Sequence, residues 1–184
     1  MAENQVNRNR TETEYKEVIA ECRAMFEAKL KDYGPAWRIL RTPSLTDQIY
    51  IKAQRIRSFE DTGIHLISEG IRPEYIGIIN YSVMALIQLE MGTGDPSAYP
   101  ATAALVAYDR FATDACRLMS DKNHDYGEAW RNMRRSSLTD IILMKLLRIK
   151  QIEDNQGKTH ISEGVDANYY RSEERRVGKE CRSR

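Results

Sequence analysis

Apolar residues recur at three- and four-residue intervals in three stretches of the first half of the chain. The first stretch, over residues 14–30, places six such side chains on one face of a helix: Tyr15, Val18, Ile19, Cys22, Phe26 and Leu30. Because a helix completes a turn every 3.6 residues, this spacing predicts an amphipathic helix. The polar run Asp32-Tyr33-Gly34 then interrupts the pattern.

Two further helices are predicted before residue 92. Ser44 and Asp47 have the spacing of a capping box, with Asp in place of the usual Glu, and an apolar-periodic run follows to about residue 59. The third helix covers residues 73–91, where Pro73 suits the first turn because a proline there loses no intrahelical hydrogen bond. Residues 92–101 are rich in Gly and Pro and predict a linker.

The second half of the chain repeats the first. Residues 29–61 and 122–154 share 18 identical residues in 33 positions without a gap, at a shift of 93. Both copies contain Asp-Tyr-Gly, Ala-Trp-Arg, Ser-Leu-Thr-Asp and Lys-x-x-Arg-Ile, and Ser-Glu-Gly follows at 68–70 and 162–164. Such agreement indicates an internal duplication. Two copies are too few for a solenoid, so we predict an all-α helical bundle in which two tandem three-helix repeats pair as an intrachain pseudo-dimer.

The repeat sets the expected boundaries. A polar N-terminal arm covers residues 1–13, the first repeat 14–91, the linker 92–101 and the second repeat 102–170. The apolar pattern ends at the last of these, and residues 171–184 resemble the translation of a sequencing adapter. We expect this tail to be non-native, with a natural basic extension as the alternative. The second repeat is therefore predicted to lack its last helix.

Charge and composition narrow the classes of function. The chain has 28 Lys+Arg against 27 Asp+Glu; the tail holds six of the basic and three of the acidic residues, so residues 1–170 carry a net charge of −2. This balance gives no electrostatic reason to expect nucleic acid or a membrane surface as a partner. The N-terminus has no secretory signal and polar residues interrupt the longest apolar stretch, residues 75–89, so a cytoplasmic protein without a membrane span is expected. The three cysteines are expected to be reduced.

The repeated motifs resemble those of the bacterial nucleotide-modification-associated domain family, over nearly everything from Tyr15 to Tyr170. More distantly, the pattern is similar to MazG-like all-α nucleoside triphosphate pyrophosphohydrolases. The resemblance implies a helical bundle that binds or processes nucleotides. In the MazG-like families, carboxylates on neighbouring helices hold magnesium, which bridges the triphosphate oxygens and activates water; magnesium prefers such oxygen ligands.

Three acidic residues are the candidate magnesium ligands: Glu21, Glu69 and Glu74. Solvated surface charge is the alternative for Glu21, and stabilisation of a helix N-terminus is the alternative for the other two. A MazG-like Glu-x-x-Asp motif starting at Glu74 would place its aspartate at position 77, which is Gly77. The corresponding residue of the second copy, Asn168, is not acidic. Neither copy therefore shows a complete set of metal ligands.

Four basic residues are the candidate phosphate ligands: Lys52, Arg55, Lys145 and Arg148. Within each copy the two residues are three positions apart and share a helix face, where the arginine offers a bidentate fork to a phosphate. Surface ion pairing, with Glu60 or Asp61 in the first copy, is the alternative.

Three more residues are candidate nucleotide contacts: Asp32, Tyr33 and Asn80. The first two could form a loop near the nucleotide; alternatively, the following glycine ends a helix and Asp32 caps the next one. Asn80 could contact a sugar or base, or be a hydrogen-bonded interior residue. Trp37 and Trp130 are predicted to be core aromatics rather than platforms for base stacking.

Together these features predict a nucleotide-processing or nucleotide-binding protein, with a magnesium-dependent nucleoside triphosphate pyrophosphohydrolase as the enzymatic hypothesis. A non-catalytic helical module for nucleotide sensing or protein interaction is the alternative, and Gly77 is the residue that favours it. The expected partner is a nucleotide, and a homo-oligomer is also compatible with the repeat.

Overall fold

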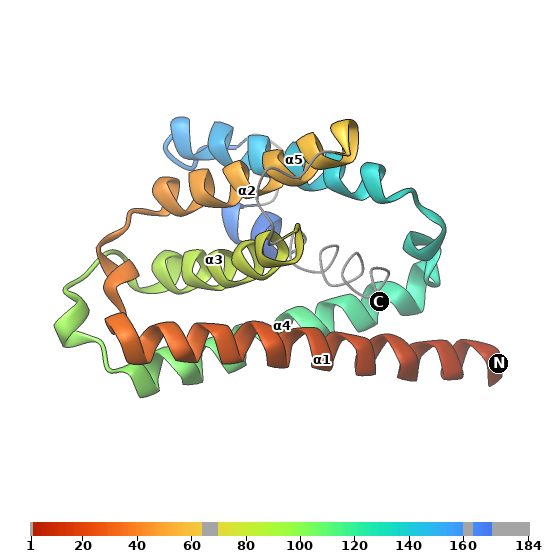
Figure 1. The fold of residues 1–184 in the computed structure, drawn as a ribbon, viewed down its shortest axis with the longest axis horizontal. Coiled ribbons are helices and arrows are strands. Elements are labelled where there is room, and N and C mark those ends of the chain that lie inside the picture. The colour runs from red at the N-terminus through yellow and green to blue at the C-terminus, as the bar shows by residue number, and fades with distance from the viewer. Residues whose placement is uncertain (1, 64–69, 160–163, 171–184) are drawn as a thin grey trace.

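The computed structural model describes residues 2–63, 70–159 and 164–170, which form α-helices and connecting turns without a strand (Figure 1). The long helices are α1 (Ala2–Tyr33), α2 (Thr42–Thr62), α3 (Arg72–Met91), α4 (Ala101–Tyr126) and α5 (Arg135–Asp154). The short 3-10 helices are η1 (Ala36–Ile39), η2 (Pro96–Ala98) and η3 (Ala129–Asn132). The all-α class predicted from the sequence is confirmed for the described part of the chain.

The helix boundaries correct two expectations about caps. The N-cap of α2 is Arg41, whose side chain makes no capping hydrogen bond, so the predicted capping box at Ser44 and Asp47 is wrong. The helix begins earlier because a proline in its first turn needs no N–H partner. Asp32 does not cap the next helix either, since it lies in the last turn of α1. Gly34, with φ of 60°, does end α1 in the left-handed conformation, as predicted.

The polar segment at residues 1–13 is helical from Ala2 onward and continues directly into the amphipathic stretch as α1. The two halves have no break between them, because the polar segment contains neither Gly nor Pro. This extension carries α1 along the whole length of α4, with which it runs antiparallel (Figure 1). The first turns of α1 therefore lie beside the end of α4.

The helices form three layers (Figure 1). In one layer α1 and α4 are antiparallel, and the Tyr15 hydroxyl donates to the Ala112 carbonyl at 2.8 Å. In the opposite layer α2 and α5 are antiparallel, and Lys150 Nζ lies 2.7 Å from Asp47 Oδ1. Each of these two outer layers pairs equivalent helices of the two copies.

Between these layers lies α3, which is buried on every face. Twelve of its twenty residues are buried, from Glu74 to Gln88. A helix surrounded in this way has no solvated stripe, which explains why its sequence is apolar all round. The predicted span, residues 73–91, agrees with the observed helix to within one residue.

The second copy retains the start of its third helix. Residues 165–170 are helical, and Tyr169 is fully buried at the position equivalent to Tyr75. The expectation that this helix is absent is therefore wrong for these six residues, because the Tyr169 hydroxyl still finds the Thr46 hydroxyl as a partner and the ring packs in the core. Residues 171–184, which carry the predicted non-native tail, lie outside the described part.

Within the described ranges, no helix is both long and apolar enough to cross a membrane. Cys22 is buried and Cys116 is partly buried, and neither takes part in a disulfide there. Cys181 falls in the undescribed tail.

Candidate functional site

Three of the predicted site residues meet where α3 begins. Lys52 and Arg55 lie one turn apart on α2, and Glu74 lies in the first turn of α3. Lys52 Nζ is 3.1 Å from Glu74 Oε2, and Arg55 Nη1 contacts Glu74 Oε1. The Glu74 side chain is 7% exposed, against 25% for Lys52 and 40% for Arg55. The cluster therefore consists of a buried carboxylate with two partly solvated cations around it.

Gly77 makes room for this cluster. A Cβ atom at position 77 would stand 2.6 Å from Lys52 Cε, closer than real Cβ atoms approach a neighbour. The aliphatic part of Lys52 thus crosses α3 at Gly77 on its way to Glu74. The glycine that interrupts a MazG-like Glu-x-x-Asp motif has a packing role in this protein.

The cluster has an excess of positive charge. Lys52 and Arg55 supply two cations, and Glu74 neutralises one of them. The helix dipole of α3 adds partial positive charge at the same place. Its first turn offers few free donors, because Pro73 has no N–H and the N–H groups of Glu74 and Tyr75 donate to the Ile71 carbonyl. An anion that reaches the solvated sides of the two cations would meet a favourable field.

The other candidate metal ligands do not join Glu74. Glu21 on α1 accepts hydrogen bonds from Arg72 of α3, with Nε 2.9 Å from Oε1. Arg72 and Glu74 are two residues apart and so point to different sides of α3, one toward α1 and the other toward α2. Glu69 lies outside the described residues.

The described residues do not fit the magnesium site that the MazG-like resemblance implies. Among them, no group of three or more His, Cys, Asp or Glu side chains is placed to hold a metal ion. Glu21 and Glu74 are instead each bound to basic side chains of the protein.

The predicted nucleotide contacts Asp32, Tyr33 and Asn80 are also separate from the cluster. Tyr33 is 72% exposed at the end of α1, which lies toward the end of α3 and away from its start (Figure 1). Asn80 is buried in the middle of α3, where its Nδ2 donates to the Cys22 carbonyl and its Oδ1 accepts from the Tyr108 hydroxyl, both at 3.0 Å. The hydrogen bonds of Asn80 therefore stay within the core.

The second copy differs at the equivalent position. Lys145 is buried and Arg148 is exposed on α5, and the residue in place of Glu74 is Asn168. Asn168 Nδ2 donates to the Gly164 carbonyl at 3.0 Å. Because an amide carries no charge, the carboxylate at the centre of the first cluster has no counterpart at this position.

Sequence reasoning overlooked the arginines of the two Ala-Trp-Arg motifs. Arg38 is 4% exposed, which is unusual for a residue of this type. Its neighbour Trp37 is in the core as predicted, whereas Trp130 is only half-buried. A signal was available in the sequence, because the motif is identical in both copies while the residue before it changes from Pro35 to Glu128.

Comparison with protein families agrees with the duplication. The sequence profile of the family described as nucleotide modification associated domain 1 matches residues 29–89 and 122–171, two segments that together span more than half of the chain. Comparisons with curated proteins and with solved structures give no significant match. The similarity to MazG-like pyrophosphohydrolases stays a prediction. The two matched segments correspond to the two copies, and the chain therefore belongs to the nucleotide modification associated domain 1 family.

Proposed function

We propose that this protein binds a nucleotide without hydrolysing it and holds a phosphate group between Lys52 and Arg55. The observation that carries the proposal is the convergence of these two cations on Glu74 at the start of α3. The family description, which associates the domain with nucleotide modification, supplies the class of ligand.

The chemistry of the cluster supports phosphate binding. Hydrogen bonds from ammonium and guanidinium groups to phosphate oxygens are charge-assisted and stronger than neutral ones. The N-terminus of α3 adds the partial positive charge of the helix dipole. Glu74 competes with the phosphate for both cations, so its role in this proposal is to set the affinity and hold the cations in place when no nucleotide is bound.

The enzymatic hypothesis needs a different arrangement. Hydrolysis of a nucleoside triphosphate by a MazG-like mechanism requires carboxylates that converge on magnesium. In the described part of the chain, Glu21 and Glu74 lie on different sides of α3 and each is bound to an arginine. These contacts favour binding over hydrolysis.

Calorimetric titration of the full chain with nucleoside mono- and triphosphates, without magnesium, tests the proposal. We expect saturable binding that Lys52→Gln and Arg55→Gln each weaken about tenfold, the effect of losing one charge-assisted hydrogen bond. Arg57→Gln is the matched control, because Arg57 lies on the same helix and its side chain is half exposed. Among the ion pairs described, it contacts Asp140 of α5, at 3.8 Å, and not Glu74.

Glu74→Gln separates binding from hydrolysis. The substitution removes the carboxylate that competes for the two cations, so we expect nucleotide to bind more tightly to this variant. A magnesium-dependent enzyme would instead lose turnover. The proposal fails if the unmodified chain shows no saturable binding, or if it releases pyrophosphate with magnesium and Glu74→Gln abolishes that release.

A further inference from the structure

The segments around Trp37-Arg38 and Trp130-Arg131, here called the two Trp-Arg loops, have the same backbone conformation. Differences in their hydrogen bonding therefore arise from side chains. Both loops are single 3-10 turns, η1 and η3. The residue before each turn also has the same conformation, with φ −81° and ψ 47° at Pro35 and φ −90° and ψ 45° at Glu128.

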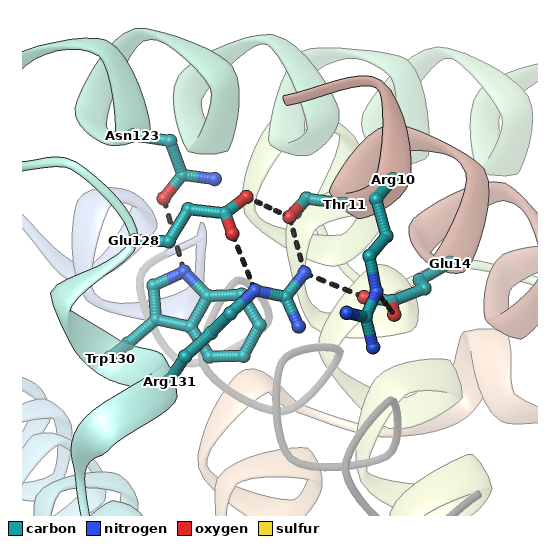
Figure 2. Close-up of polar contacts among 7 residues, drawn as sticks. All are labelled: Arg10, Thr11, Glu14, Asn123, Glu128, Trp130 and Arg131. Atoms are coloured by element: carbon teal, nitrogen blue, oxygen red, sulfur yellow. Dashed lines mark hydrogen bonds and ion pairs between the residues drawn. The ribbon is translucent and has the colours of Figure 1, made fainter. Parts of the chain in front are cut away.

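In the second copy, side chains of the protein itself accept hydrogen bonds from the loop (Figure 2). Arg131 Nε donates to Glu128, and Arg131 Nη2 donates to Glu14 Oε2 on α1 at 2.8 Å. Trp130 Nε1 donates to Asn123 Oδ1 at 3.2 Å. The guanidinium of this loop is therefore held between two carboxylates.

In the first copy, the same two donors lack acceptors. Arg38 Nε and Trp37 Nε1 are buried, and neither has a hydrogen-bond partner within the described residues. The Arg38 guanidinium donates to the neutral Gln88 side chain and lies 5.0 Å from the centre of the Tyr99 ring. An aromatic face and an amide oxygen compensate the charge only in part, so a carboxylate or phosphate oxygen at Nε would be stabilised.

The sequence differences between the copies account for the missing acceptors. At the shift of 93 residues, three acceptor side chains of the second site are replaced: Glu128 by Pro35, Asn123 by Leu30, and Glu14 by Ala107. None of the replacing side chains can accept a hydrogen bond. The donors themselves are unchanged.

We propose that the first Trp-Arg loop is a binding site for an oxyanion, of the phosphate or carboxylate type, whose oxygens accept from Arg38 Nε and Trp37 Nε1. In the second copy two side chains of the protein take the place of this ligand: Glu128 accepts from Arg131 Nε, and Asn123 accepts from Trp130 Nε1. The site is distinct from the nucleotide site proposed above, because Gln88 and Glu74 are 14 residues apart on α3, about 21 Å along a helix. It stands whether or not Lys52 and Arg55 bind a nucleotide.

The linker between α3 and α4 covers the site. Gly94 N donates to the Arg38 carbonyl at 3.0 Å, and a Cβ at Gly94 would stand 3.1 Å from Arg38 Nη2. Most linker residues are solvent-exposed, whereas Tyr99 at its end is buried against Arg38. The segment next to the donors is therefore this exposed linker.

Thermal unfolding and calorimetry of the full chain in a cationic buffer, titrated with inorganic phosphate and in parallel with acetate, test the proposal. We expect saturable binding of one of these anions and a rise in the unfolding temperature. Arg38→Gln should weaken the binding by about tenfold or more, the effect of losing a charge-assisted hydrogen bond. Arg131→Gln is the matched control and should leave anion binding unchanged, because its loop is already filled by Glu128.

Pro35→Glu provides a second variant that does not remove the arginine. It places a carboxylate where Glu128 stands in the second copy, and the matching backbone angles let the side chain adopt the same geometry. We expect this variant to lose anion binding and to be no less stable than Pro35→Ala. Absence of anion binding to the unmodified chain, or equal binding by Arg38→Gln or Pro35→Glu, would overturn the proposal.

Discussion

The two copies place an identical Ala-Trp-Arg sequence in contrasting electrostatic settings. In the second copy Arg131 lies between Glu14 and Glu128, whereas Arg38 of the first copy faces an amide oxygen and aromatic rings. The backbone of the two loops is the same, so the difference arises from the exchanged acceptors, Pro35 for Glu128 among them. Duplication has preserved the donors and let the acceptors diverge.

At the start of the third helix the contrast is reversed. Here the first copy supplies the internal carboxylate, Glu74, which holds Lys52 and Arg55, and the second copy has the uncharged Asn168. Each copy therefore compensates one of its basic clusters with an acidic residue that its counterpart lacks. Substitutions that remove or add these acidic residues give the most direct tests of the difference.

The largest loss in the free energy of unfolding is expected from Glu74→Ala. Removing a buried carboxylate from two cations costs about 3 kcal/mol or more when all partners are buried; because Lys52 and Arg55 are partly solvated, we expect a loss of about 2 kcal/mol. Asn168→Ala, which removes one hydrogen bond to Gly164, should cost about 1 kcal/mol. Urea denaturation at neutral pH measures both free energies of unfolding. Equal losses would show that the charge of Glu74 contributes nothing beyond a hydrogen bond.

A smaller loss in the free energy of unfolding is expected when acid protonates Glu14 and weakens its contact with Arg131. Burial opposes ionisation of Glu14, but hydrogen bonds from Arg131 and Arg10 outweigh it, so the carboxyl pKa is lowered from its ordinary value of 4.5. Because the folded-state pKa is the lower one, the stabilisation is complete above about pH 4.5 and is lost as the pH falls through the folded-state value.

Glu14→Gln tests this contact. The variant should be less stable than the unmodified chain by about 1 kcal/mol at pH 7, and the difference should shrink as the pH falls below 4.5. Amide hydrogen exchange should rise in acid at residues 128–132 and not at residues 35–39, whose loop contains no carboxylate. A constant difference between variant and unmodified chain from pH 7 to pH 3 would contradict the assignment.

The smallest expected effect on the free energy of unfolding comes from Glu153 of α5, which contacts Thr46 of α2. Burial raises the pKa of this carboxyl above its ordinary value of 4.5. The hydrogen bond donated by Thr46 lowers the pKa, but by less than burial raises it. The folded state therefore holds the proton more tightly, and the free energy of unfolding decreases as the pH rises from 4.5 to the raised folded-state pKa.

Glu153→Gln should remove this decrease. We expect the variant to be more stable than the unmodified chain above the raised pKa, by less than about 1 kcal/mol, because the group is only partly buried. Asp154→Asn, at an exposed neighbouring position, is the comparison variant. It should reduce the pH dependence only in part, because repulsion from Asp154 adds less to the pKa of Glu153 than burial does. A pH profile that is unchanged in Glu153→Gln would refute the role given to burial.

Part of the fold was predictable because it depends on local periodicity. The stripe from Tyr15 to Leu30, the all-round apolar α3 and the left-handed Gly34 are properties of short segments. The start of α2 was predicted wrongly: its N-cap is Arg41, three residues before the Ser44 of the expected capping box, and Pro43 lies in the first turn. The third helix of the second copy was predicted to be absent, yet residues 165–170 are helical and Tyr169 is buried, with its hydroxyl bonded to Thr46 of α2.

The candidate site was predictable only in part. The three-residue spacing places Lys52 and Arg55 on one face of α2, and they do act together. The sequence also suggested Glu21 as a companion of Glu74, but the structure places these two side chains on opposite sides of α3. Helical periodicity specifies which residues of one helix share a face, and it contains no information on which other helix that face meets.

By itself, then, the sequence of this family member determined its helices, its duplication and the repeated donors at Trp37-Arg38 and Trp130-Arg131. Only the tertiary structure decided which carboxylate meets which cation, and that the Lys52 side chain crosses α3 at Gly77. The physical reason is that helix formation depends on contacts three and four residues apart, whereas the partner of a buried charge comes from a different helix, up to 117 residues away in the case of Glu14 and Arg131.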